Sequence, residues 1–392
     1  MSVIEMTTFV VAPDRTSKML AARPAMLSAF RTDRRGFIAA RLVRVAENTW
    51  LDMVEWADAD AFDASRAKGA NLPEIAAFFA TIDELVSVRS GVRYDDAADG
   101  PRAVRTIAYG TEPSQVGELY LPEGDGPFPV VVLVHGGWWT AMFDHREAVP
   151  LAEDLVSLGF AVWNIEYRRI GEPGGGWPGT FDDVAAAVDA VADLDPAIDT
   201  RRVLVVGHSA GGHLATWVAH RAALPEGVPG ARPGIKPIGA VSLAGVLDLV
   251  DADEVGLGSV LTDLDAEPPR GAPPAAHPEV WPAVAAEAGD GVARLLLGGG
   301  VAEHAERYAV ASPVLLADGG VPVLALHGMA DEVIPPAYAR TYAEAATAKG
   351  ADVTLVESPG ADHFGVVDLD GHAWGVTRGW LAERLRQAES GG

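Results

Sequence analysis

Hydrophobic and polar positions follow one clear pattern over most of the chain. From residue 129 onward, short continuous runs of β-branched and other apolar residues alternate with stretches that have helical spacing. Strands of a parallel sheet have this composition, because helices cover both faces of such a sheet. The pattern predicts a doubly wound, mainly parallel α/β sheet with strands over residues 130–134, 161–167, 203–206, 238–243, 321–326 and 353–356, and helices over residues 148–158, 180–194 and 212–223.

The first 92 residues carry a different pattern. A β-rich run is followed by a stretch of helical spacing that Pro24 interrupts, and two further β-rich runs flank a turn near Glu47 and Asn48. The order of elements, β-α-β-β-α-β, is the ferredoxin-like plan. We therefore predict a small α+β domain with strands over residues 3–11, 36–46, 50–56 and 85–92, and helices over residues 17–30, 58–67 and 72–82.

Charge separates the same two regions. The formal net charge of the 392 residues is −25, of which residues 1–92 carry −1 and residues 93–392 carry −24. An asymmetry of this size supports two separate domains. We place them at residues 1–92 and 93–392, with the boundary in the polar stretch 93–104.

Composition excludes several classes of function. An acidic chain lacks the basic face that a nucleic-acid partner requires. The absence of cysteine excludes disulfides, thiol catalysis and thiolate metal sites. No apolar run reaches the roughly 18 residues of a membrane span, and the first residues lack the features of a signal peptide. We expect a soluble, cytoplasmic protein without a nucleic-acid or membrane partner.

The N-terminal region resembles the antibiotic-biosynthesis-monooxygenase-like family of dimeric α+β domains. The resemblance is carried by the segments WLDMVEW and ADADAFDASRAKGANLPEIAAFFATID. It implies either a cofactor-independent oxygenase or a dimerisation module, and residues 1–92 contain no histidine that could bind haem. Asn48, Trp50 and Trp56 would line a cavity or belong to turn and core. Homodimerisation is the default expectation for this domain.

One motif in the larger region points to a nucleophile. The strand predicted at 203–206 runs into GHSAGG, which fits the pattern G-x-S-x-G with Ser209 at its centre. A serine on so sharp a strand-to-helix turn needs small neighbours, which Gly207 and Gly211 provide. The helix N-terminus beneath it would help to stabilise developing negative charge. A chance glycine-serine loop is the alternative, but a buried strand before it and an apolar helix after it argue against that.

A nucleophilic serine needs an acid and a base, which this type of fold supplies in the order Ser, Asp or Glu, His. Asp331 follows the strand at 321–326, and the adjacent Glu332 is its rival, with a side chain expected to point the other way. Of ten histidines, only His363 follows both Ser209 and Asp331 on a loop at a strand end. We predict the catalytic set Ser209, Asp331 and His363.

An oxyanion hole is predicted from the segment HGGWW, which follows the strand at 130–134. Two glycines at a strand end leave backbone N–H groups free to meet an oxyanion. Gly137 and Trp138 are the expected donors from this loop, together with Ala210 after the nucleophile. A plain turn with both tryptophans in the core is the alternative.

Together, HGGWW, GHSAGG, AGVLDL, HGMADEVIPP and the final DHF resemble the α/β-hydrolase superfamily. Within it they are similar to the esterase/kynurenine formamidase-like group, and the resemblance covers about 260 residues. It implies hydrolysis of a small ester or aryl formamide through an acyl-enzyme, with no metal or cofactor. The N-terminal domain is not expected in a dedicated formamidase.

An insertion of about residues 250–308, rich in Pro, Gly and Ala, leaves room for a cap over the strand ends. Trp139, Trp177 and Trp281 are candidate walls of a substrate pocket, and a role in the core is equally open for them. We expect a carboxylesterase or arylformamidase type of serine hydrolase. The alternatives left open are a bifunctional enzyme with an N-terminal oxygenase, an N-terminal dimerisation module, and an acyltransferase.

Overall fold

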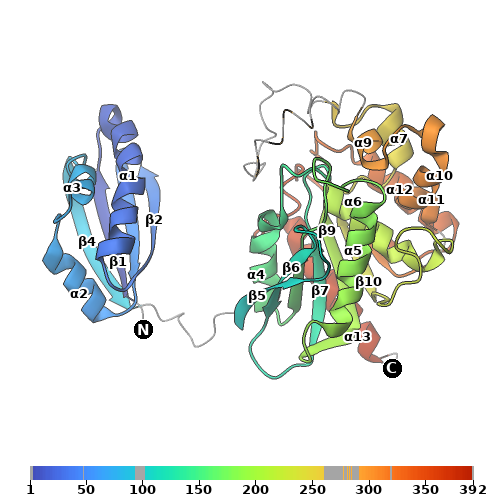
Figure 1. Cartoon of the computed structure of the whole chain (residues 1–392), viewed down its shortest axis with the longest axis horizontal. Helices are drawn as coiled ribbons and strands as arrows, with labels where there is room; N and C mark the ends of the chain where they lie inside the picture. The colour runs from blue at the N-terminus through green and yellow to red at the C-terminus, as the bar shows by residue number, and fades with distance from the viewer. Residues whose placement is uncertain are drawn as a thin grey trace. The chain divides into compact units, whose positions relative to one another are not determined.

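A computed structural model of the chain describes residues 3–46, 48–92, 102–259, 291–317 and 320–390, together with residues 277, 280, 282 and 284. The chain forms two compact units, Met1–Gly100 and Pro101–Gly392 (Figure 1). Most of the insertion expected at residues 250–308 lies outside the described residues. No helix in the described part of the chain has both the length and the apolar composition to cross a bilayer.

The first unit is a four-stranded antiparallel sheet covered by helices, in the order β2-β3-β1-β4. Its apolar core joins the inner face of the sheet to the helices. The chain order follows the β-α-β-β-α-β plan, with the second helical part divided after Lys68, where Gly69 has a φ of +55°. The elements are β1 (Val3–Val10), α1 (Pro13–Asp33), β2 (Phe37–Ala46), β3 (Thr49–Trp56), α2 (Ala59–Lys68), α3 (Pro73–Phe79) and β4 (Glu84–Val92).

Helix α1 runs without interruption through Pro24, the residue that interrupts the helical spacing of this segment. A proline inside a helix removes one backbone hydrogen bond. Met19, Met26 and Phe30 are buried on either side of Pro24 and anchor both halves in the core. Tertiary packing therefore outweighs the local preference.

The second unit is built on an eight-stranded sheet in the order β12-β11-β10-β9-β7-β8-β6-β5. The six strands β7 to β12 are parallel. At one edge β6 pairs antiparallel with β8, and β5 pairs antiparallel with β6. The six parallel strands are those that the apolar runs predicted. The strands are β5 (Arg102–Ala108), β6 (Val116–Leu121), β7 (Phe128–Val134), β8 (Ala161–Ile165), β9 (Ile198–His208), β10 (Gly239–Leu243), β11 (Val323–Gly328) and β12 (Val353–Ser358).

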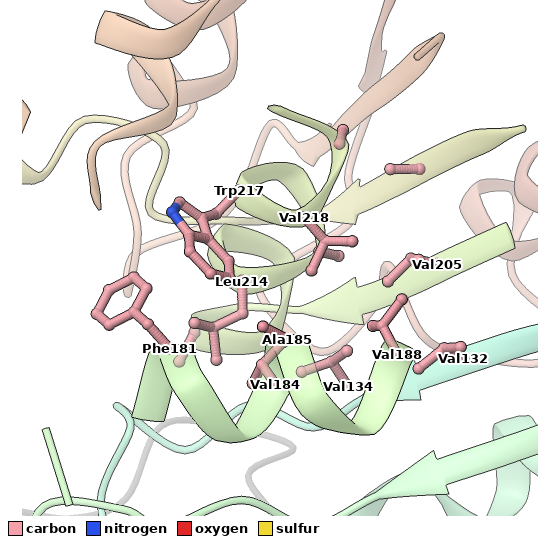
Figure 2. Packing of buried hydrophobic residues seen from close by; sticks show 14 of the residues in the cluster. Val132, Val134, Phe181, Val184, Ala185, Val188, Val205, Leu214, Trp217 and Val218 are labelled. Atoms are coloured by element: carbon pink, nitrogen blue, oxygen red, sulfur yellow. The ribbon is translucent and has the colours of Figure 1, made fainter. Parts of the chain in front are cut away.

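Two helical layers enclose this sheet, which is why its central strands are fully buried. One face packs against α5 (Gly179–Asp189), α6 (Ala210–His220) and α12 (Ala337–Ala348), and the other against α4 (Val149–Ser157) and α13 (His372–Ser390). The segment between β10 and β11 contributes α7 (Leu249–Glu254), α9 (Val292–Leu297), α10 (Val301–Ala311) and α11 (Pro313–Leu316). Figure 2 shows Phe181, Val184, Ala185 and Val188 of α5 and Leu214, Trp217 and Val218 of α6 packed over Val132, Val134 and Val205.

The parallel strands place their carboxyl ends at one edge of the sheet. In open α/β sheets this edge carries the ligand-binding and reacting groups. The segments after β7, β9, β11 and β12 are those that contain the predicted site residues.

Candidate active site

Ser209 occupies a strained turn between β9 and α6. Its φ of +55° and ψ of −121° lie in a region that a residue with a side chain rarely adopts. Its N–H donates to the carbonyl of Leu243 at 2.8 Å. A Cβ on Gly207 would lie 2.1 Å from the Gly211 carbonyl oxygen, and a Cβ on Gly211 would lie 2.1 Å from that of Val134. Both positions therefore require glycine for the turn to close.

Asp331 and His363 form a buried pair on neighbouring loops. His363 Nδ1 donates to Asp331 Oδ2 at 2.7 Å, and the N–H groups of Val333 and Ile334 donate to Oδ1 at 2.8 Å each. His327 Nε2 donates to Oδ2 at 3.1 Å. Glu332, the rival acid, is exposed. The structure therefore pairs Asp331, and not its neighbour, with the histidine.

Protonation in this pair is settled by its hydrogen bonds. Burial opposes ionisation of Asp331, but the hydrogen bonds from His327 and His363 outweigh it and hold the pKa of the carboxyl well below its usual range. Donation from Nδ1 leaves Nε2 as the acceptor on the neutral imidazole of His363. A carboxylate that fixes one tautomer of a histidine is the arrangement that a general base needs.

The histidine also lies against the turn that carries Ser209. His208 Nε2 donates to the backbone carbonyl of His363 at 2.9 Å, and the two rings are 4.7 Å apart between centroids. Burial, and then the neighbouring His363, lower the pKa of His208 to about 3, so it is neutral. No hydrogen bond joins Ser209 to His363 within the described part of the chain. Such bonds are often loose until substrate binds.

The segment after β7 folds into a tight loop against Ser209. Gly137 has a φ of +89°, and Trp138 and Trp139 both have a φ of +58°. A Cβ on Gly136 would lie 3.2 Å from the Cβ of Ser209, which places this loop beside that serine. Ala210 begins α6, so its N–H has no partner within the helix. Among the described residues, no acceptor is bonded to the N–H of Gly137, Trp138 or Ala210.

Two carboxylates, the buried Glu166 and the half-buried Glu147, hold the start of this loop, which we call the oxyanion loop (residues 135–139). Glu147 accepts the N–H of Gly136, and Glu166 Oε1 accepts His135 Nε2 at 2.8 Å. Glu166 also pairs with His145 and with Arg169 Nη1, the latter at 3.0 Å. The sequence analysis gave these carboxylates no role. Their only sequence signal is position, since Glu166 follows β8 as His135 follows β7.

The three tryptophans predicted as pocket walls have different surroundings. Trp139 is fully buried in the core, which is the alternative that the sequence left open. Trp177 is half-buried and packs edge-on against Phe181, with 5.2 Å between the ring centroids. Its backbone N–H donates to the carbonyl of Leu296 at 2.7 Å. Trp281 lies outside the described residues. Across the residues that the structure covers, no group of three or more His, Asp or Glu side chains is arranged so that it could hold a metal ion.

Comparison with known proteins gives one family match and several relatives. Residues 118–255 match the BD-FAE family. Esterase LipC of Mycobacterium tuberculosis is 27% identical over 296 residues, which cover 72% of this chain and 64% of LipC. Esterase EstD of Thermotoga maritima is 32% identical over 128 residues, 31% of each chain. The chain spans about half to two thirds of the length of the curated relatives it matches first, 64% of LipC and 50% of Esterase LipQ.

Solved structures decide the fold. A truncated carbohydrate esterase from gut microbiota superposes with a TM-score of 0.54 at 20% identity, over 74% of this chain and 98% of that one. Esterase B of Lactobacillus Rhamnosis gives a TM-score of 0.55 at 19% identity, over 73% and 86%. The second unit has the α/β-hydrolase fold. From here on we call it the hydrolase unit, a name taken from its fold. At this level of identity the likeness carries the fold alone, and it confirms the predicted fold class.

Proposed function

We propose that the hydrolase unit cleaves a carboxylic ester through an acyl-enzyme on Ser209. The observation that carries this proposal is the buried Asp331–His363 pair at 2.7 Å beside a strained serine turn. Several relatives of the chain are named as esterases, which supports the same class of reaction.

The proposed reaction uses each group in turn. Ser209 Oγ attacks the ester carbonyl while His363 Nε2 accepts the hydroxyl proton, and the ionised Asp331 stabilises the imidazolium. The N–H groups of Gly137, Trp138 and Ala210 would hold the oxyanion. His363 then gives the proton to the departing alcohol, and a water molecule, activated in the same way, releases the acid and restores Ser209.

An aryl formamide is the second candidate substrate. The aromatic pair that follows the two glycines of the oxyanion loop favours it, as does the resemblance of HGGWW and GHSAGG to the formamidase-like group. The same machinery would transfer a formyl group to Ser209 and release an aryl amine.

One panel of substrates tests both candidates. We would measure hydrolysis of p-nitrophenyl esters from acetate to octanoate and of N-formylkynurenine by the wild type, Ser209→Ala and Ser157→Ala. Ser157 is the matched control, because it is an exposed serine at the end of α4. We expect Ser209→Ala to lose at least about 10³-fold in kcat, and Ser157→Ala to lose nothing. Ester hydrolysis that survives in Ser209→Ala would refute the proposal.

For the first unit we propose a role in homodimerisation. More than half of the exposed large apolar side chains in the described part of the chain belong to this unit, although it is only a quarter of the sequence. Ile38 and Val45 on β2 and Leu85 and Val86 on β4 are each more than half exposed. β2 and β4 are the two edge strands of the sheet, and exposed apolar surface of this extent supports a role in an interface. Light scattering of the full chain should show a dimer that Ile38→Lys/Val45→Lys converts to a monomer, and an unchanged mass would count against this role.

A cavity supports the alternative that the first unit binds a small molecule for oxidation. It has a volume of about 480 Å³ and is lined by Phe30, Trp56 and Arg34 among others. Oxygen consumption with an aromatic quinol, lost in Trp56→Phe, would favour the oxygenase hypothesis over dimerisation alone.

A further inference from the structure

The end of the oxyanion loop is fixed by one buried histidine. Trp139 Nε1 donates to His213 Nδ1 at 3.2 Å, and His213 Nε2 donates to the carbonyl of Ala311, the last residue of α10, at 2.9 Å. The two rings meet edge-on with 5.3 Å between their centroids. Neither side chain has any exposed surface. Three separate segments, the oxyanion loop, α6 and α10, therefore share this imidazole.

Only one form of the imidazole satisfies both neighbours. Burial lowers the pKa of His213 to about 4, so the ring is neutral near pH 7. With the proton on Nε2, the ring donates to Ala311 and accepts from Trp139. The other tautomer, or the imidazolium, would place a proton at Nδ1 against the indole N–H. A buried donor left without an acceptor is destabilising, so the arrangement is specific.

Trp139 has a backbone conformation that needs such support. It and Trp138 are consecutive non-glycine residues at positive φ, which the surrounding structure must impose. The backbone of Trp139 is held through its carbonyl, which accepts the N–H of Ile170 at 2.8 Å. Its side chain is held by His213. The N–H of Trp138, an expected oxyanion donor, lies between this fixed end and the carboxylate-bound Gly136.

We propose that His213 is a positioning residue of the active site, which holds the Trp138 N–H in place for the oxyanion by fixing the Trp139 indole. The inference rests on the proposed function, because it assigns that N–H its role in an acyl transfer. His213 touches no reacting atom in this scheme. It lies four residues after Ser209 on the same helix, so nucleophile and oxyanion loop are kept in a common frame.

The chain offers a matched control for the Trp139 bond. Trp217, also fully buried, lies on the same helix as His213, and its Nε1 donates to the carbonyl of Val310 on α10 at 2.9 Å. Phe181 packs edge-on against both His213 and Trp217, at 5.9 and 5.0 Å. Trp217→Phe therefore removes an indole hydrogen bond from the same part of the core but none from the oxyanion loop.

The experiment compares Trp139→Phe, His213→Leu and Trp217→Phe with the wild type. For each we would measure kcat and KM for a p-nitrophenyl ester and the inhibition constant of the matching trifluoromethyl ketone, which forms an oxyanion on Ser209. Removing an oxyanion donor lowers kcat by about 10²–10³-fold, and a displaced donor should lower it by about 10–100-fold. We expect this loss in Trp139→Phe and His213→Leu, with KM changed less than about threefold and the ketone bound more weakly by the same factor as the loss in kcat/KM.

Three outcomes decide the matter. Trp217→Phe should keep kcat within about threefold. The double variant Trp139→Phe/His213→Leu should be no slower than His213→Leu, because His213→Leu already lacks the bond that Trp139→Phe removes. Equal losses in Trp139→Phe and Trp217→Phe, or ketone affinity unchanged while kcat/KM falls, would overturn the role of His213. Turnover that survives Ser209→Ala would instead overturn the proposed function, so the two failures are distinguishable.

Discussion

Each unit of the chain buries an aspartate paired with a basic side chain, and the two pairs have different surroundings. In the first unit, Arg23 donates two hydrogen bonds of 2.8 Å to the two oxygens of Asp52. In the hydrolase unit, Asp331 binds His363 through one nitrogen and leaves the other as an acceptor. A strained serine and unbonded N–H groups lie beside the second pair only. A buried charge pair therefore indicates a reactive site when its neighbours are strained or left without partners, and a structural contact when both partners are saturated.

The largest difference between the two pairs should appear when each aspartate becomes asparagine. We expect Asp331→Asn to lower kcat/KM by about 10⁴-fold, because an amide favours the wrong tautomer of His363. Asp52→Asn should leave ester hydrolysis within twofold of the wild type and destabilise the first unit by about 3–5 kcal/mol, because Arg23 stays buried without its charge partner. Steady-state kinetics and urea denaturation of both variants check this. If Asp52→Asn lost activity and Asp331→Asn did not, the roles given to the two pairs would be wrong.

A smaller effect is expected at the carboxylate beneath the oxyanion loop. Glu166→Gln should lower kcat by about 10–100-fold, because His135 loses its charged partner and the loop loses its fixed start. Asp154→Asn is the control within the same unit. Asp154 accepts Trp374 Nε1 at 2.8 Å and pairs with Arg378, between α4 and α13. The variant Asp154→Asn should be less stable than the wild type and keep its kcat. Similar kinetics for Glu166→Gln and Asp154→Asn would contradict the role of Glu166 in holding the oxyanion loop.

The fold of the hydrolase unit could be predicted because its strands are continuous apolar runs and its motifs lie where those runs end. Ser209, Asp331 and His363 each follow such a run, and the structure places all three at the same edge of the sheet. Strands β5 and β6 were missed. The described side chains of β5 are almost all exposed, and β6 mixes half-buried with buried positions, so neither strand is a continuous apolar run; β5 also begins inside the stretch expected to be a linker.

The residues that support the site could not be predicted from local pattern. His213 meets Trp139 across 74 positions of sequence and Ala311 across 98, and Glu166 meets His135 across 31. A buried polar group is defined by the partner that packing brings to it, and that partner leaves no periodic signal. Helix α1 runs through Pro24 for the same reason, since contacts in the core of the first unit outweigh the local pattern.

Acid should destabilise the hydrolase unit through its buried histidines, and this effect should be smaller than the losses of activity described above. The pKa values of His208 and His213, about 3 and about 4, lie below the ordinary 6.5, so the unfolded chain binds more protons in this range. Stability is therefore complete above pH 6.5 and is lost as pH falls toward 4, by up to about 1.4 kcal/mol per pH unit for each histidine. We would follow urea denaturation by the labelling of Ser209 with a fluorophosphonate, which reports on the hydrolase unit. His213→Leu should flatten the slope, and substitution of the exposed His372 by Gln should not.

The smallest effect is expected at Glu147. Burial raises the pKa of this carboxyl, so its ionised form is disfavoured in the folded state and stability falls as pH rises above about 4.5. Glu147→Gln keeps an oxygen that can accept the Gly136 N–H and removes the charge. We expect it to raise the free energy of unfolding at pH 7 and to change nothing at pH 4. Equal effects at the two pH values would show that charge is not the cause.

The turn at Ser209 also sets stability against activity. Its backbone conformation is one that only glycine adopts without strain, and such strain is of order 1–3 kcal/mol. Replacing Ser209 by glycine should relieve that strain and yield a chain that unfolds at a higher temperature than either the wild type or Ser209→Ala, although it lacks the proposed nucleophile. Selection for thermal stability alone would therefore drive this position away from serine, and only a requirement for turnover would keep it there.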